Sequence, residues 1–64
     1  MLTDIGAKIR AERRRHQLTQ EQLAELSGTS TRTVRDIEHG HGSTSIGTVA
    51  AVASALGLAL TVTP

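Results

Sequence analysis

The stretch Leu18–Glu38, LTQEQLAELSGTSTRTVRDIE, constrains the fold of this chain more than any other segment. Thr19 and Gln22 have the spacing of a capping box, which predicts a helix over Gln20–Ser27. Gly28 follows, and glycine adopts the left-handed backbone that ends many helices at little steric cost. The first half of the stretch therefore predicts a short helix closed by a glycine turn.

A second helix, Thr31–Glu38, is expected directly after the turn, with Ser30 as its N-cap. The apolar stripe of the first helix consists of Leu23, Ala24 and Leu26. Val34 and Ile37 form the inward face of the second helix, and the small Ala24 lets the two helices cross closely. A short glycine turn between helices crossing at roughly 90–120° defines the helix-turn-helix unit. An ordinary αα-hairpin in a small bundle shows the same individual signals.

The combined pattern LTQEQLA…G…V…IE is more specific than its parts. It resembles the lambda-repressor/Cro-like helix-turn-helix family over roughly residues 5–58. The resemblance implies an all-α fold, with a compact four-helix helix-turn-helix domain over residues 1–57. To this the alternating pattern described below adds a short C-terminal β-strand over residues 58–64 that pairs across a dimer. The family usually has glycine before the LTQ motif, where this chain has Gln17. This departure predicts a small strain, or a different turn, at the end of the first helix.

Two further helices flank the central unit. The first should run from about Asp4 to His16 with Thr3 as its cap, and the last from Ser45 to a stop at Gly57. The residues expected to face the core from the first helix and the connection after it are Leu2, Ile5, Ile9 and Leu18. The last helix should run through Ile46, Val49, Val52, Ala53 and Leu56, and packing must hold it because its helix propensity is poor.

After Gly57 the apolar period changes to alternation, the pattern of a half-buried strand. The alternating residues are Leu58, Leu60 and Val62. A single strand cannot satisfy its own backbone groups, so we expect it to pair with the same strand of a second copy; a frayed tail is the alternative. A strand in this place resembles the HipB-type antitoxins, which implies a homodimer and a toxin protein as a partner.

Composition excludes several classes of function. A chain of 64 residues allows one domain, and with no cysteine there is neither a disulfide nor a thiolate metal site. The absence of aromatic residues argues against single-stranded nucleic acid or RNA as a ligand. No nucleophile–base set or convergent carboxylates suggest an enzyme, and no cofactor is implied. Without a signal peptide or a membrane-spanning run, we expect a cytoplasmic, nucleoid-associated protein of bacteria.

Charge is unevenly distributed along the chain. Residues 1–16 carry five basic and two acidic side chains, a net charge of +3 with histidine neutral, whereas residues 39–64 carry no Asp, Glu, Lys or Arg. A basic first helix suits a polyanion such as DNA, and a solvated helix face explains it nearly as well. Arg14 and Arg15 can likewise attract DNA at long range or belong to a solvated helix face.

The family resemblance also assigns structural roles outside the turn. It implies a partly buried ion pair between Arg13 and Glu38, the alternative being two exposed charges of little energetic value. The loop around residues 40–43 is expected to offer backbone amides to a DNA phosphate. His39 and His41 lack an evident third ligand, so a metal site is disfavoured.

The second helix of the unit is the candidate reading element, because a major groove accepts one helix whose N-terminal residues reach the base edges. The residues expected to contact bases are Thr31, Arg32 and Arg35, and those expected to contact phosphates are Gln20, Ser30, Thr33, His41 and Ser43. We therefore expect a dimeric repressor of a palindromic operator in double-stranded DNA, within the family an antitoxin. The alternative is a protein-interaction adaptor with the same fold.

Overall fold

Four α-helices make up the described part of the chain. The computed structural model describes residues 2–40 and 45–57, which form α1 (Leu2–Arg15), α2 (Gln20–Ser27), α3 (Thr31–Glu38) and α4 (Ile46–Ala55). No strand occurs within these two ranges. The all-α, four-helix fold expected from the sequence is confirmed, and the C-terminal strand expected over residues 58–64 lies outside the described residues.

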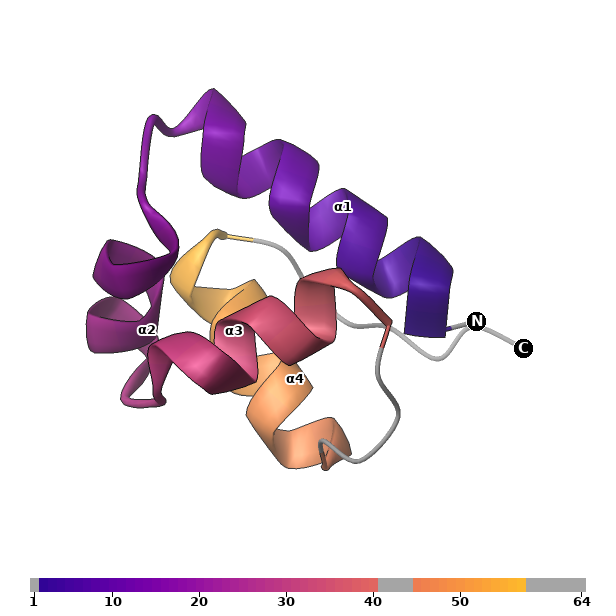
Figure 1. The fold of residues 1–64 in the computed structure, drawn as a ribbon. Helices are drawn as coiled ribbons and strands as arrows, with labels where there is room; N and C mark the ends of the chain where they lie inside the picture. Colours follow the sequence, from indigo (N-terminus) through magenta and orange to yellow (C-terminus); the bar gives the residue numbers. More distant parts are fainter. Residues whose placement is uncertain (1, 41–44, 58–64) are drawn as a thin grey trace.

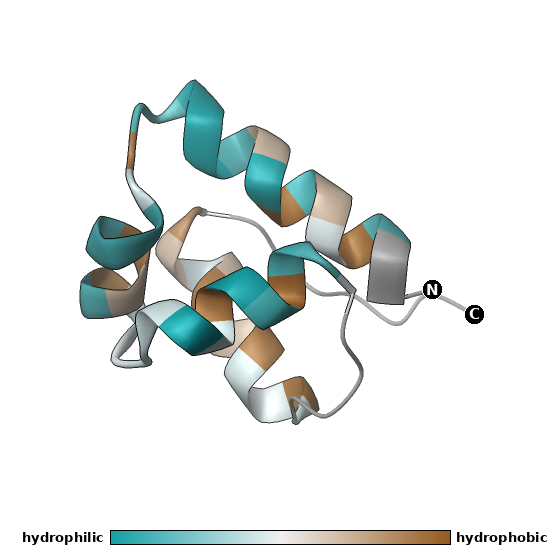
Figure 2. Cartoon of the chain, in the orientation of Figure 1, coloured by the Kyte–Doolittle hydropathy of each residue, from teal (hydrophilic) through white to brown (hydrophobic). Residues whose placement is uncertain are grey.

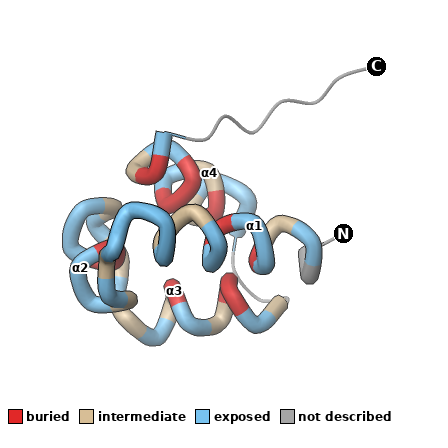
Figure 3. The backbone as a smooth tube through the Cα atoms, turned by 90° about the horizontal axis from the view of Figure 1, so that it is seen from above, coloured by how far each residue is buried: buried red, intermediate tan, exposed pale blue. Residues whose placement is uncertain are grey.

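Helices α2 and α3 are central to the packing, because each contacts two other helices. Figure 1 shows α1 running alongside α3, with which it packs, while α2 packs against both α3 and α4. Helices α2 and α3 are joined by a short turn and cross at a steep angle (Figure 1). Figure 3 shows the buried positions gathered on the inward sides of the helices. This arrangement leaves the opposite side of α3 facing solvent, which matters for the site described below.

The core is aliphatic throughout. Its buried residues are Ile9, Leu23, Ala24, Val34, Ile37, Val49, Val52, Ala53 and Leu56. Ile5 and Leu18, both expected in the core, are partly buried against it. Figure 2 shows hydrophilic and hydrophobic residues alternating along α1, α2 and α3, whereas α4 is coloured from white to brown.

Leu26, expected in the inward apolar stripe of α2, is 63% exposed, and that prediction was wrong. Ile46 in α4 is also exposed, at 70%. On a helix with about 100° per residue, Leu26 lies about 160° from the buried Ala24, so the two cannot share one inward face. Ile46 is the first residue of α4, one turn ahead of Val49, the first buried residue of that helix.

Local capping accounts for most helix boundaries. Thr19 Oγ1 accepts from the backbone N–H of Gln22, and the Gln22 side chain accepts from the backbone N–H of Thr19 at 2.8 Å, which completes the predicted capping box. Ser30 caps α3 as predicted, and Ser45 caps α4 rather than forming its first residue. Helix α1 begins at Leu2, so Thr3 lies within the helix and is not its cap.

The end of α1 has the strain that the sequence suggested. Gln17 has φ 58°, a left-handed conformation unusual for a residue with a Cβ. The backbone N–H of Gln17 donates to the Arg14 carbonyl, and that of Leu18 donates to the Arg13 carbonyl. This pattern is the Schellman motif, which places a left-handed residue, usually glycine, at the position of Gln17. Gly28 has φ 71° at the corresponding place after α2, as expected.

Helices α1 and α3 approach closely at Gly6. This residue is buried, and a Cβ added to it would overlap the backbone carbonyl oxygen of Ile37. Because the obstructing atom belongs to the backbone of α3, a side chain rotation cannot relieve the overlap. The glycine therefore sets the distance between the first helix and the end of α3.

Candidate nucleic-acid interface

The solvent-facing side of α3 presents two arginines. Arg32 and Arg35 are exposed, while Thr31 and Thr33 are partly buried. Neither arginine donates to any group in the described ranges, so both guanidinium groups are available to an external ligand. This outward side results from the burial of Val34 and Ile37 on the opposite face.

The N-terminus of α3 is held by its own hydroxyl groups. Ser30 Oγ accepts from the backbone N–H of Thr33 at 3.1 Å and lies 2.9 Å from Thr33 Oγ1. These two side chains, both expected to contact phosphate, thus already bond to each other. Ser30 is exposed, so its hydroxyl remains reachable from solvent.

The ion pair expected between α1 and α3 is present. Arg13 Nε donates to Glu38 Oε2 at 2.6 Å, and Arg13 Nη2 donates to Oε1 at 3.1 Å. The two side chains are only 11% and 1% exposed. Arg13 Nη1 also donates to the Leu18 carbonyl at 2.8 Å, which ties the start of the α1–α2 connection to the same network. A two-point Arg–carboxylate contact fixes orientation as well as distance.

Gln20 joins this network from α2, a contact that sequence reasoning missed. Its Nε2 donates to Glu38 Oε1 at 3.2 Å. Glu38 therefore accepts from side chains of both other helices that flank α3. The sequence assigned Gln20 to phosphate, and its polar type alone gave no indication of an internal partner. Every buried side-chain N or O atom of the described residues has a hydrogen-bond partner.

Several residues of the expected site are not placed by the structure. Those outside the described ranges are His41, Ser43, Leu58, Leu60 and Val62. Within the described residues, no group of three His, Cys, Asp or Glu side chains is arranged to hold a metal ion. The described helices also include none with the length and apolarity needed to cross a bilayer.

A comparison with protein families identifies the class of this molecule. The helix-turn-helix family model matches residues 9–62, which include the second half of α1 and all of α2, α3 and α4. The chain belongs to this family, the Cro/C1-type helix-turn-helix proteins, which are DNA-binding regulators. A comparison with curated proteins gives no match.

Proposed function

We propose that this protein is a sequence-specific transcription regulator that represses by occupying its operator. The observation that carries the proposal is the pair of exposed guanidinium groups of Arg32 and Arg35 on α3, which have no partner among the residues that the structure describes. Each can donate to base edges, and arginine to guanine is the commonest specific contact in the major groove. The Arg13–Glu38–Gln20 network supports the proposal, because it holds α3 at a fixed angle to its neighbours.

In the proposed complex α3 lies in the major groove. Its first turn approaches the base edges, so Arg32 contacts guanine and the methyl group of Thr31 contacts a thymine methyl. Arg35, one turn further along, reaches the next base. Phosphate contacts come from the start of α2 and α3, through Gln20, Ser30 and Thr33, and from His41 and Ser43 in the following loop.

A single domain of this size contacts only a few base pairs, so we propose a two-fold dimer. Two copies of α3 about 34 Å apart match half-sites one helical turn apart, which makes the operator palindromic. Residues 58–64, with Leu58, Leu60 and Val62 on one face, supply the dimer contact. A protein of this type acts on the bacterial nucleoid in the cytoplasm, and the HipB-like tail supports an antitoxin that also binds a toxin protein.

Selection of bound duplexes from a random pool tests the DNA-binding proposal. We expect an inverted repeat whose half-sites lie about one turn apart. On the selected site, Arg32→Ala should weaken binding by about 1–3 kcal/mol and relax the preference at one base-pair position. Equal weakening on every sequence would contradict base reading by Arg32. Recovery of no preferred duplex by the wild type would instead favour the protein-interaction adaptor.

The dimer proposal has a separate test. Leu60→Asp places a charge on the face proposed to pair, so the variant should be monomeric in light scattering at concentrations where the wild type is dimeric. Ala59→Asp, on the other face of the alternating segment, is the matched control and should leave the dimer intact. A dimeric Leu60→Asp variant would place the interface elsewhere, with α4 the first candidate.

A further inference from the structure

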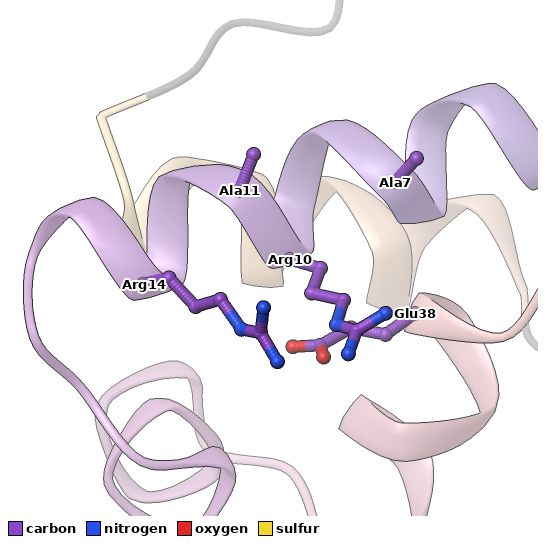
Figure 4. Close-up of a pocket in the computed structure, with 5 residues that line it drawn as sticks. All are labelled: Ala7, Arg10, Ala11, Arg14 and Glu38. Carbon is purple, nitrogen blue, oxygen red and sulfur yellow. The ribbon is translucent and has the colours of Figure 1, made fainter.

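A pocket between α1 and α3 has no role in the interface described so far. It is an open hollow of about 270 Å³ beside the last residue of α3. Its lining residues are Ala7, Arg10, Ala11, Arg14 and Glu38. Figure 4 shows the guanidinium groups of Arg10 and Arg14 extending from α1 toward the side of the pocket where Glu38 lies. The two arginines are four residues apart, the spacing that places side chains on the same face of a helix.

The pocket carries a net positive charge. Both oxygens of Glu38 are already engaged, Oε2 by Arg13 Nε and Oε1 by Arg13 Nη2 and Gln20 Nε2. Arg13 balances the charge of this carboxylate. Throughout residues 2–40 and 45–57, the side chains of Arg10 and Arg14 have no hydrogen-bond or ion-pair partner. Two guanidinium groups therefore face one hollow in which no acidic side chain of the described residues is left to neutralise them.

Helix stability accounts for only part of this pair. Arg14 lies in the last turn of α1, where a cation is favourable. Its spacing from Arg10 brings two like charges together, and an anion bound between them would relieve their repulsion. Guanidinium groups suit phosphate in particular, because their planar array of N–H donors matches the oxygens of the group in two-point contacts.

The position of the pocket indicates where such a phosphate belongs. Glu38 is the last residue of α3, so the pocket adjoins the reading helix along its flank, where α1 runs beside it (Figure 1). The major groove is about 12 Å wide and a helix with side chains is about 10–12 Å across. A helix that fills the groove brings the elements beside it against the sugar–phosphate backbone that borders the groove.

We infer that Arg10 and Arg14 bind one backbone phosphate of duplex DNA in this pocket. The inference rests on the proposed function, since it requires α3 to lie in the major groove. The contact is independent of base sequence. It fixes the position of the C-terminal end of α3 on the duplex, while Arg32 reads bases near the other end of the helix.

Salt-dependent binding to the selected duplex tests this assignment. Arg10→Gln and Arg14→Gln should each weaken binding roughly tenfold, because each removes a hydrogen bond between charged groups. Each should also reduce the slope of log Kobs against log salt by about 1, with preference among sequences unchanged. Both side chains are on the surface of α1 and glutamine is a good helix former, so thermal unfolding should show that the variants fold.

Lys8→Gln is the matched control. Lys8 is exposed, unpartnered among the described residues and on the same helix, but it does not line the pocket. It lies two residues from Arg10, about 160° around the helix. Its replacement removes the same charge and should change affinity and slope much less. An equal effect of Lys8→Gln would overturn the pocket assignment. It would favour a non-specific electrostatic attraction of DNA by all the basic residues of α1.

Ethylation of single phosphates gives a second measurement. One ethylated position should block the wild type and have little effect on the Arg10→Gln/Arg14→Gln double variant. If the wild type binds the duplex and no position behaves in this way, the pocket assignment is wrong and the proposed function stands. If the wild type binds no duplex, the pocket assignment and the proposed function are both wrong.

Discussion

Replacing Gln17 by glycine should stabilise the protein. Gln17 holds φ 58° between α1 and α2, and a left-handed conformation costs a residue with a Cβ roughly 1–2 kcal/mol. Glycine removes that cost. Its greater conformational freedom in the unfolded chain lowers the gain in stability by about 0.5–1 kcal/mol. The Schellman hydrogen bonds to the carbonyls of Arg13 and Arg14 are made by the backbone and survive the change. The Gln17 side chain is exposed, so no core contact is lost.

The expected net gain for Gln17→Gly is about 0.5–1 kcal/mol, which for a domain of this size raises Tm by roughly 2–8 °C. Urea denaturation and thermal unfolding measure the two quantities. Gln17→Ala is the control, because it removes the side chain but keeps the Cβ and hence the strain, so its stability should match the wild type. A Gln17→Gly variant with unchanged or lower Tm, or an equal gain in Gln17→Ala, would refute the explanation by backbone strain.

Two further stability predictions follow from the contacts of α1 with α3. Gly6→Ala should lower the free energy of unfolding by about 1–3 kcal/mol, because its Cβ overlaps the Ile37 carbonyl. Gly47→Ala, where a Cβ meets only open space, should be neutral or stabilising in the same urea titration; equal losses at both glycines would contradict the close approach. Glu38→Ala should cost about 3–5 kcal/mol, since it leaves Arg13 buried without its partner. A double-mutant cycle with Arg13→Ala measures the coupling, and a coupling near zero would contradict the role of the pair.

The elements that the sequence predicted best are those determined by neighbouring residues. The capping box of Thr19 and Gln22, the Ser30 cap and the left-handed Gly28 depend on backbone groups within a few positions, so their residue types and spacing were sufficient. The unusual conformation of Gln17 was also predictable, because glutamine occupies a position where the family usually has glycine.

The features that sequence reasoning missed depend on how the helices sit against one another. Leu26 is apolar and follows Leu23 at helical spacing, but the buried face of α2 is centred nearer Ala24 and excludes it. Gly6 had no turn or motif to mark it, and its role comes from the backbone of α3. The contact of Gln20 with Glu38 joins residues 18 positions apart, and polar type alone gave no reason to pair them.

The residue that anchors α3 to its neighbours is distinct from the residues that α3 presents to an external ligand. The carboxylate that anchors this helix is its last residue, whereas Thr31 and Arg32 lie at its opposite end and Arg35 projects away from the core. None of these three side chains takes part in the bonds to Glu38, so their substitution leaves the anchoring bonds intact. In the proposed DNA complex, new sequence preferences can therefore arise, by evolution or by engineering, while the angle of α3 to its neighbouring helices is kept.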